Sequence, residues 1–319
     1  MNLFARLRLA CLFLALPVLA GCLAEADTTP SAARKSSSGP LNVVCTIGQV
    51  GDMARRIGAK HVAVYDLMGA GVDPHLYRAT ISDTKRLKEA DVIFYNGLHL
   101  EGRMVEMLEN LAKSKPVFAI TERIERDQPD RLRHPAEFHG QFDPHIWFDV
   151  KLWSDCLAVV EDHLCKLDAV HAAEFHKNAA AYREQLSKLD TWCRERMALI
   201  PKPQRVLVTA HDAFGYFGSA YDVEVHGIQG VSTADEADLG HITELVELLV
   251  TRKIKAVFVE SSVPPKLIES LIRPARARGH KVVKGGELFS DAMGPAGMHE
   301  GTYVGMIEHN INTIVTALK

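Results

Sequence analysis

The tripeptide Asp-Pro-His occurs twice in this chain, as Asp73-Pro74-His75 and as Asp143-Pro144-His145. Proline fixes its own φ and pushes the residue before it into an extended conformation, so each histidine is presented by a stiff backbone. A stiff backbone suits a metal ligand. His211, directly after a predicted strand, and Asp291, in a late acidic loop, supply two more donors. The sequence therefore predicts a divalent-metal site formed by His75, His145, His211 and Asp291.

The chemistry of this donor set favours a transition metal. Three imidazoles and one carboxylate suit zinc, which binds such nitrogen and oxygen atoms at about 2.0–2.2 Å. Exchanging an imidazole for a carboxylate moves the preference toward harder ions such as manganese. Glu260, at the end of an apolar run, is either an alternative carboxylate ligand or an acceptor that orients a ligating imidazole. We favour the second role for Glu260 and expect Zn²⁺ or Mn²⁺ as the bound ion.

Other residues and motifs in the sequence are weaker indications of function. His134 and His139 lie in the polar loop before the second tripeptide, where they either pass metal along or are solvated loop residues, and we favour the latter. The chain has no HExxH, Walker A or GxGxxG sequence, so the metalloprotease and nucleotide-binding routes lack a motif. We assign no catalytic and no cofactor-binding residue.

The elements that must position these donors alternate between strand and helix. Such alternation is typical of parallel sheets with crossover helices. In the first half we predict strands at 41–47, 61–67, 91–95 and 117–120, with helices at 50–57, at 102–112 and from a cap at Ser82 or Asp83 through Ala90. In the second half we predict strands at 205–210, 256–259 and 280–284, with helices at 241–252, after Pro264-Pro265 and at 299–318.

Two long stretches without Gly or Pro separate the halves, at 151–166 and 170–200. The second would be a helix of roughly 45 Å. We therefore predict an α/β fold with two lobes, each a parallel β-sheet flanked by helices, joined by one long rigid helix. The boundaries are 41–168 for the N-terminal lobe, 169–200 for the linker helix and 201–319 for the C-terminal lobe. Ligands bind beyond the carboxyl ends of parallel strands, which places the predicted site in the cleft between lobes.

The first 40 residues resemble an export and anchoring segment. Residues 1–21 contain two arginines, then an apolar run too short to span a membrane, as in a secretory signal. The sequence Leu19-Ala20-Gly21-Cys22 predicts lipidation of Cys22, the alternative being an ordinary signal with an incidental cysteine. Residues 22–40 have the composition of a flexible tether. We expect an extracytoplasmic protein, in the periplasm or at the cell surface, held at a membrane by its lipid anchor.

The charge balance bears on nucleic-acid binding, and the cysteines bear on disulfide pairing. Lys and Arg number 37 against 40 Asp and Glu, a balance that gives no sign of a nucleic-acid-binding surface. Four cysteines follow Cys22, with no CxxC pair: Cys45, Cys156, Cys165 and Cys193. A bridge between Cys165 and Cys193 is one alternative, and we favour buried free thiols. We expect a monomer.

From Leu41 to Lys319 the chain resembles the zinc/manganese solute-binding lipoproteins of bacterial ABC importers, cluster A-I and class III, and most closely the TroA-type members. The two Asp-Pro-His segments are part of that resemblance. The other matching stretches are Ala90-Asp91 with Tyr95-Asn96-Gly97-Leu98, Asn178 and Tyr182, His211 to Phe217, Gly227 to Thr233, and Gly286 to Gly294.

The resemblance implies two lobes bridged by a rigid helix, metal held by His75, His145, His211 and Asp291, and delivery of that metal to an ABC permease, with no enzymatic activity. Relatives dedicated to manganese or iron often carry glutamate where this chain has His211, which favours zinc or a zinc/manganese mixture. Many zinc-dedicated relatives carry a long His-rich loop before the second tripeptide. Here residues 121–142 are short and hold two histidines, which argues against strict zinc selectivity.

Two rival functions belong to other classes. A zinc hydrolase needs an open coordination position and a nearby base, for which Glu260 or Asp212 is available. Four protein ligands would leave no room for an activated water. A surface adhesin is the other alternative. That role is compatible with transport, and no residue in the sequence encodes it.

Overall fold

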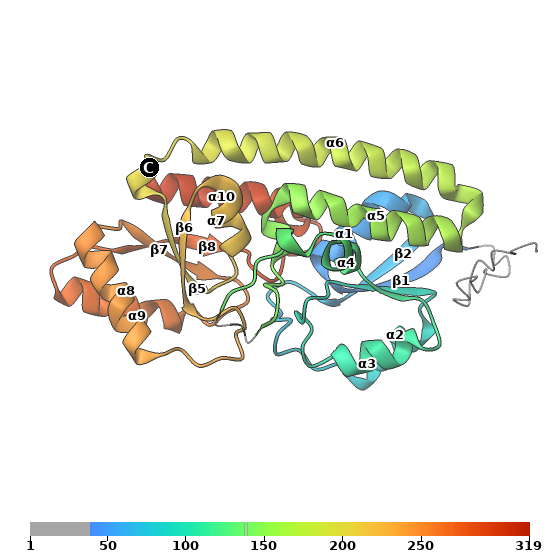
Figure 1. Cartoon of the computed structure of the whole chain (residues 1–319), viewed down its shortest axis with the longest axis horizontal. Helices are drawn as coiled ribbons and strands as arrows, with labels where there is room; N and C mark the ends of the chain where they lie inside the picture. Colours follow the sequence, from blue (N-terminus) through green and yellow to red (C-terminus); the bar gives the residue numbers. More distant parts are fainter. Residues whose placement is uncertain (1–38, 137, 139) are drawn as a thin grey trace, which may run out of the picture. The chain divides into compact units, whose positions relative to one another are not determined.

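The computed structural model describes residues 39–136, 138 and 140–319. The predicted signal, the lipidation site Cys22, most of the tether and His139 lie outside the described residues. Elements alternate between strand and helix along the chain, as the sequence predicts, and every paired strand is parallel (Figure 1). The α/β class with parallel sheets is confirmed.

The first half builds a four-stranded parallel sheet in the order β2-β1-β3-β4. Its central strand β1 is buried along almost its whole length because both of its neighbours and the covering helices exclude water. The strands are β1 (Leu41–Ile47), β2 (Val62–Met68), β3 (Val92–Tyr95) and β4 (Val117–Ala119), and the helices are α1 (Gly48–Gly58), α2 (Ile81–Glu89), α3 (Val105–Ala112), α4 (Glu122–Asp127) and α5 (Val150–Leu167).

The second half contains two parallel pairs, β5-β6 and β7-β8, with β5 packed beside β7. Along β5, Leu207 packs into one hydrophobic cluster and Val206 and Val208 into another, as the alternation of side chains in a strand requires. The elements are β5 (Val206–His211), α7 (Gly215–Tyr221), β6 (Glu224–Gln229), α8 (Leu239–Arg252), β7 (Ala256–Glu260), α9 (Lys266–Ala277), β8 (Val283–Leu288) and α10 (Tyr303–Leu318).

One long helix, α6 (Ala172–Met197), follows α5 in the chain. Its 26 residues span about 39 Å, somewhat less than expected, because a separate short turn occupies residues 169–171. The helix packs against α1 and α5 of the first half and against α10 at the end of the chain (Figure 1). Because α6 contacts elements of both halves, it is consistent with a rigid connection between them.

Several boundaries differ from the sequence-based expectation. Helix α2 is capped by Thr80, whose hydroxyl accepts the N–H of Asp83 while the Asp83 carboxylate accepts the N–H of Thr80, so neither Ser82 nor Asp83 is the cap. His211 is the last residue of β5 and does not follow the strand. Helices α4 and α7 and strand β6 were not predicted.

The alternative bridge between Cys165 and Cys193 is wrong. Both residues, like Cys45 and Cys156, are free thiols. The Sγ atom of Cys165 lies 3.8 Å from the carbonyl oxygen of Ala172 in the first turn of α6. Cys193 is buried 21 residues further along the same helix, about 31 Å away at the α-helical rise. That separation is far beyond the reach of a disulfide.

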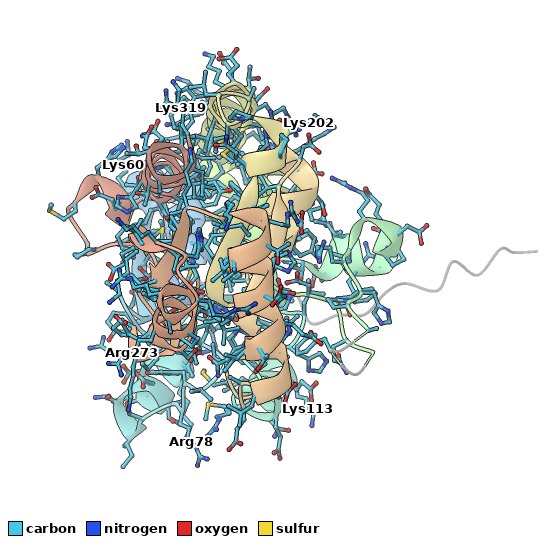
Figure 2. All side chains as sticks on the ribbon, turned by 90° about the vertical axis from the view of Figure 1, so that its left-hand side faces the viewer. Lys60, Arg78, Lys113, Lys202, Arg273 and Lys319 are labelled. Atoms are coloured by element: carbon cyan, nitrogen blue, oxygen red, sulfur yellow. The ribbon has the colours of Figure 1, made fainter. Side chains whose placement is uncertain are left out.

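None of the helices in the described part of the chain is long and apolar enough to cross a bilayer. Exposed cations come from several different elements. Figure 2 labels six of them, Lys60, Arg78, Lys113, Lys202, Arg273 and Lys319, all of which are exposed.

Candidate metal centre

Four buried side chains meet in one cluster within the described residues. His75, His145, His211 and Asp291 each offer a ligand atom, and these atoms all lie within 4.8 Å of one another. The Nε2 atoms of His75 and His145 are 3.2 Å apart, and Asp291 Oδ1 lies 3.3 Å from Nε2 of both His145 and His211. Asp291 Oδ2 is 3.9 Å from His75 Nε2. The structure thus brings together the four residues that the sequence singles out.

His75 is positioned by the turn that follows β2. Within this turn Asp73 Oδ1 accepts the backbone N–H of His75 at 2.9 Å and that of Leu76 at 3.4 Å. The carboxylate thereby closes a local turn that proline has already stiffened. His75 is 5 % exposed and the other three residues are at most 1 % exposed, so His75 lies nearest to the surface of the four.

His145 is positioned by a second copy of the same turn. Asp143 Oδ1 accepts the backbone N–H of His145 at 3.0 Å and also lies 2.8 Å from Nδ1 of the imidazole. The side-chain amide of Asn96, at the end of β3, donates to the carbonyl oxygen of Pro144 at 3.0 Å. These contacts aim Nε2 of His145 into the cluster, since Nδ1 is occupied by the carboxylate.

His211 and Glu260 end two neighbouring strands, β5 and β7. Glu260 Oε1 accepts the backbone N–H of His211 at 2.9 Å, and Oε2 lies 2.5 Å from the imidazole Nδ1. Glu260 is outside the group of four and contacts one of its imidazoles. This is the position that a carboxylate would take to orient a metal-binding histidine.

Asp291 lies in the loop after β8, and its backbone is held by side chains from the first half of the chain. The amide of Gln49 in α1 donates to the carbonyl oxygen of Asp291 at 3.1 Å. The indole of Trp147 donates to the carbonyl oxygen of Ser290 at 3.1 Å. Gln49 and Trp147 are fully buried. The loop that supplies the carboxylate donor is thus fixed by both halves.

Burial and neighbouring charge shift the pKa values of the four donors apart. Burial lowers the pKa of His75 to about 3. Burial also opposes protonation of His145, but the carboxylates of Asp143 and Asp291 raise its pKa to about 9. The pKa of His211 lies well above its usual value because Glu260 and Asp291 outweigh burial. Burial favours the neutral form of Asp291, yet the imidazoles of His211 and His145 hold its pKa well below the usual range.

The spacing of the donors fits a small divalent ion. Four ligands at zinc distances on the corners of a tetrahedron would be separated by about 3.3–3.4 Å. Three of the separations, 3.2, 3.3 and 3.3 Å, are close to that edge length, whereas Asp291 Oδ2 is 3.9 Å from His75 Nε2 and the full set of donor atoms extends to within 4.8 Å. The pKa values of His145 and His211 are raised, so an ion that bound to these imidazoles would displace protons from them.

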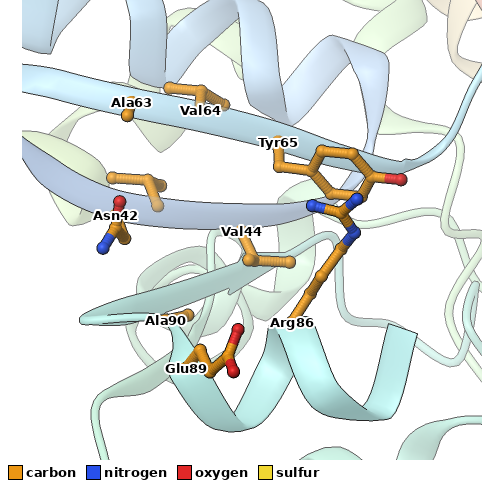
Figure 3. Close-up of a pocket in the computed structure, with 9 residues that line it drawn as sticks. Asn42, Val44, Ala63, Val64, Tyr65, Arg86, Glu89 and Ala90 are labelled. Carbon is orange, nitrogen blue, oxygen red and sulfur yellow. The ribbon is translucent and has the colours of Figure 1, made fainter. Parts of the chain in front are cut away.

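The weaker candidates lie outside the cluster. The His134 ring packs edge-on against Phe142, with ring centroids 5.5 Å apart. Asp212 follows His211, and burial raises the pKa of its carboxyl group, but it supplies no atom to the donor set. A separate surface pocket of about 350 Å³ lies between β1, β2 and α2, where the Arg86 guanidinium stacks 4.0 Å from the Tyr65 ring centre (Figure 3). The residues that line it contribute no donor to the cluster.

Sequence reasoning missed three functional features of the site. Asp143 appeared only as part of the repeated tripeptide, although its carboxylate contacts the ligand imidazole. Gln49 lies in an unremarkable helical segment, and nothing in the sequence near it points to Asp291, 242 residues away. Trp147 lies two residues after His145, and its residue type there does not indicate a contact with the loop of Asp291. The Trp147 indole donates to the carbonyl oxygen of Ser290, 143 residues away, a contact between elements distant in sequence.

A parallel α/β fold with a buried cluster of three imidazoles and one carboxylate defines a protein with a transition-metal-type donor set. The chain belongs to the ZnuA family, described as zinc-uptake complex component A, periplasmic, whose model matches residues 43–317. This match spans both halves of the protein and all four donors.

Similar proteins include relatives named for either metal. The chain is 49 % identical over 287 residues to the manganese-binding lipoprotein MntA of Bacillus subtilis, covering 90 % of this chain and 92 % of that one. It is 48 % identical over 313 residues to the zinc-binding protein TroA of Treponema pallidum, covering 98 % and 99 %. The solved structure of periplasmic zinc-binding TroA from T. pallidum superposes with a TM-score of 0.84 at 50 % identity, covering 88 % of this chain and 99 % of that one.

Proposed function

We propose that this protein is an extracytoplasmic, lipid-anchored solute-binding protein that captures zinc or manganese and delivers it to an ABC permease. The observation that carries the proposal is the buried cluster in which His75, His145, His211 and Asp291 converge within 4.8 Å. In this function the metal is cargo. Its binding must be tight enough to capture a scarce ion and reversible enough to hand it over.

The proposed roles of individual residues follow from the contacts around the cluster. His75, His145, His211 and Asp291 bind the ion, and Asp143 and Glu260 hold two of the imidazoles by their Nδ1 atoms. In line with the predicted domains, residues 41–168 and 201–319 each supply two donors, and residues 169–200 connect them. Capture then requires both halves, because neither holds a complete donor set.

The membrane-related part of the proposal rests on the sequence and on the relatives. Leu19-Ala20-Gly21-Cys22 has the form of a lipid attachment site. The similar MntA of B. subtilis is named a lipoprotein. We infer that residues 1–21 are removed, that lipid is added to Cys22 and that residues 22–40 tether the body to a membrane, where it meets its permease as a monomer.

Transport fits the donor set better than hydrolysis does. A hydrolytic zinc site keeps one coordination position open for water. Here three imidazoles and a carboxylate converge, and Glu260, the carboxylate available as a base, is engaged by both the backbone N–H and the imidazole of His211. A tetrahedral ion held by all four donors would leave no position for an activated water. The family to which the chain belongs is one of solute-binding transport proteins.

Metal analysis of protein purified without chelator, followed by competition titrations of zinc against manganese, tests the proposal. We expect one transition-metal ion per chain and displacement of one metal by the other. Protein that retains neither zinc nor manganese, and binds neither when it is added, would refute the proposed function.

A further inference from the structure

A hydrogen bond at the rim of the cluster joins two segments that are 160 residues apart. The hydroxyl of Thr233 donates to Asp73 Oδ2 at 2.6 Å. Asp73 belongs to the turn that presents His75, and Thr233 lies in the loop between β6 and α8. Both residues are half-buried, whereas the four donors are buried. The bond therefore lies between the donor cluster and the surface.

The two carboxylate oxygens of Asp73 accept different hydrogen bonds. Oδ1 accepts the backbone N–H groups of His75 and Leu76, while Oδ2 accepts the hydroxyl of Thr233. Because Thr233 fixes one oxygen, the carboxylate cannot rotate away from the turn without breaking a charge-assisted hydrogen bond. Thr233 thus holds the backbone of His75 through Asp73.

The loop that carries Thr233 is tied to the strand that carries His211. The amide of Gln229, the last residue of β6, donates to the carbonyl oxygens of Asp235 at 2.8 Å and Thr233 at 3.4 Å. Gln229 is also the register partner of His211 in the β5–β6 pair. A continuous path of contacts therefore runs from His211 through Gln229, Thr233 and Asp73 to His75 without passing through the metal position.

His75 depends on this path more than the other histidines do. His145 and His211 each have a carboxylate close to Nδ1, from Asp143 and Glu260 respectively. The Asp73 carboxylate instead accepts the backbone N–H of His75, so it restrains the turn and not the ring. His75 is also the ligand nearest to solvent. Release of the ion is easiest if His75 moves first.

We propose that Thr233 is a positioning residue that latches the His75 turn across the metal site and slows release of the ion. This inference rests on the proposed metal-capture function and identifies the contact that sets how long the cargo is retained. Opening the latch breaks the bond between Thr233 and Asp73. The Asp73 turn then moves with His75, and three donors remain around the ion.

The test compares the rate of zinc release from three variants of the full chain, measured by stopped flow against an excess of a chromogenic chelator. Thr233→Val removes the hydroxyl at nearly constant volume, and Thr233→Ser keeps it. Thr243→Val is the matched control, because the Thr243 hydroxyl donates to the carbonyl oxygen of Leu239 within α8. We expect about tenfold faster release from Thr233→Val, in line with loss of one hydrogen bond to a charged group. Thr233→Ser and Thr243→Val should release zinc at the rate of the parent.

A second measurement separates latching from a general loss of stability. Thr233→Val, Asp73→Asn and the double variant form a double-mutant cycle. If both residues act through one hydrogen bond, the double variant should release zinc no faster than the quicker of the two single variants. Thr233→Ala replaces Thr233→Val if the latter does not fold. The latch is refuted if release from the hydroxyl-free variant stays within twofold of the parent, or if Thr233→Ser releases zinc as fast as Thr233→Val. Failure of the parent to bind zinc or manganese refutes the proposed function instead.

Discussion

Glu260 contacts His211 twice, with Oε1 on the backbone N–H at 2.9 Å and Oε2 2.5 Å from the imidazole Nδ1. The two residues end neighbouring strands, so the sheet itself sets the distance between them. One carboxylate thereby fixes both the backbone and the ring of His211. With Nδ1 occupied, Nε2 is the nitrogen left to face Asp291 in the cluster.

Replacing Glu260 with glutamine should weaken zinc binding by about 10- to 100-fold, the usual cost of losing a carboxylate that orients a metal-binding histidine. The glutamine amide keeps the shape of the Glu260 side chain but loses its negative charge. Its NH₂ group would place a hydrogen-bond donor where an acceptor for the His211 N–H is needed. Competition with a chromogenic chelator measures the change. Glu244→Gln, at an exposed position on α8, is the control and should bind like the parent. Equal affinities for the two variants would remove Glu260 from the site.

Replacing His75 with alanine should lower zinc affinity by at least about two orders of magnitude while the fold is retained, because one of four ligands is lost from a loop. Chelator competition gives the affinity, and circular dichroism checks the fold. His134→Ala is the control, since His134 packs against Phe142 outside the cluster. An unchanged affinity of the His75 variant would show that His75 does not bind the ion.

Replacing His211 with glutamate should shift selectivity from zinc toward manganese. The change exchanges a borderline nitrogen for hard oxygen donors that can bind in a bidentate manner, which favours an ion that accepts more than four ligands. The added negative charge raises affinity for any dication, so only the ratio of affinities is diagnostic. Titrations of both metals at one pH and ionic strength measure it. A manganese-to-zinc affinity ratio equal to or below that of the parent contradicts the prediction.

The metal-free protein should lose stability as the pH rises, while the increment in stability given by zinc should grow. The pKa of His145 rises from about 6.5 in the unfolded chain to about 9 in the fold. Its contribution to stability is therefore complete below pH 6.5 and is lost as the pH rises to 9, so the unfolding temperature of the metal-free protein should fall over that window. The extra stability given by zinc should grow over the same window, because the ligands must lose protons to bind it.

Unfolding temperatures recorded from pH 6 to pH 9, with and without saturating zinc, test this prediction in a single buffer series. His134→Ala serves as the control for titration of a histidine outside the cluster and should follow the parent. A zinc-dependent increment that stays constant from pH 6 to pH 9 would contradict a site in which protons and metal compete for the same imidazoles.

The sequence predicts the donors well because their signals are local. Each Asp-Pro-His turn is specified by three adjacent residues, and the structure repeats the same carboxylate-to-backbone contact at Asp73 and Asp143. Runs of apolar residues predict His211 directly after one strand and Glu260 at the end of another, and each is the last residue of its strand in the structure. These are short-range patterns in which residue type and spacing contain most of the information.

The parts that the sequence did not predict depend on long-range contacts or on short elements. Helix α7 has only seven residues and includes Gly215 and Gly218, which lower its intrinsic helix propensity, so only tertiary packing specifies it. The Gln49 amide and the Trp147 indole meet the loop of Asp291 across 242 and 143 residues. The hydrogen bond of Thr233 to Asp73 is another long-range contact, across 160 residues. Such contacts depend on how the two halves of the chain pack together, and no local sequence pattern predicts that packing.

The buried bonds from Gln49 and Trp147 to the backbone of residues 290 and 291 also limit how this protein can be recombined with its relatives. A chimera that takes residues 41–168 from one relative and residues 201–319 from another can inherit all four donors unchanged. It would still misplace the carboxylate unless the residues at positions 49 and 147 match the incoming loop. For this fold, the unit that must be exchanged intact is the ligand loop together with its two anchors on the opposite half.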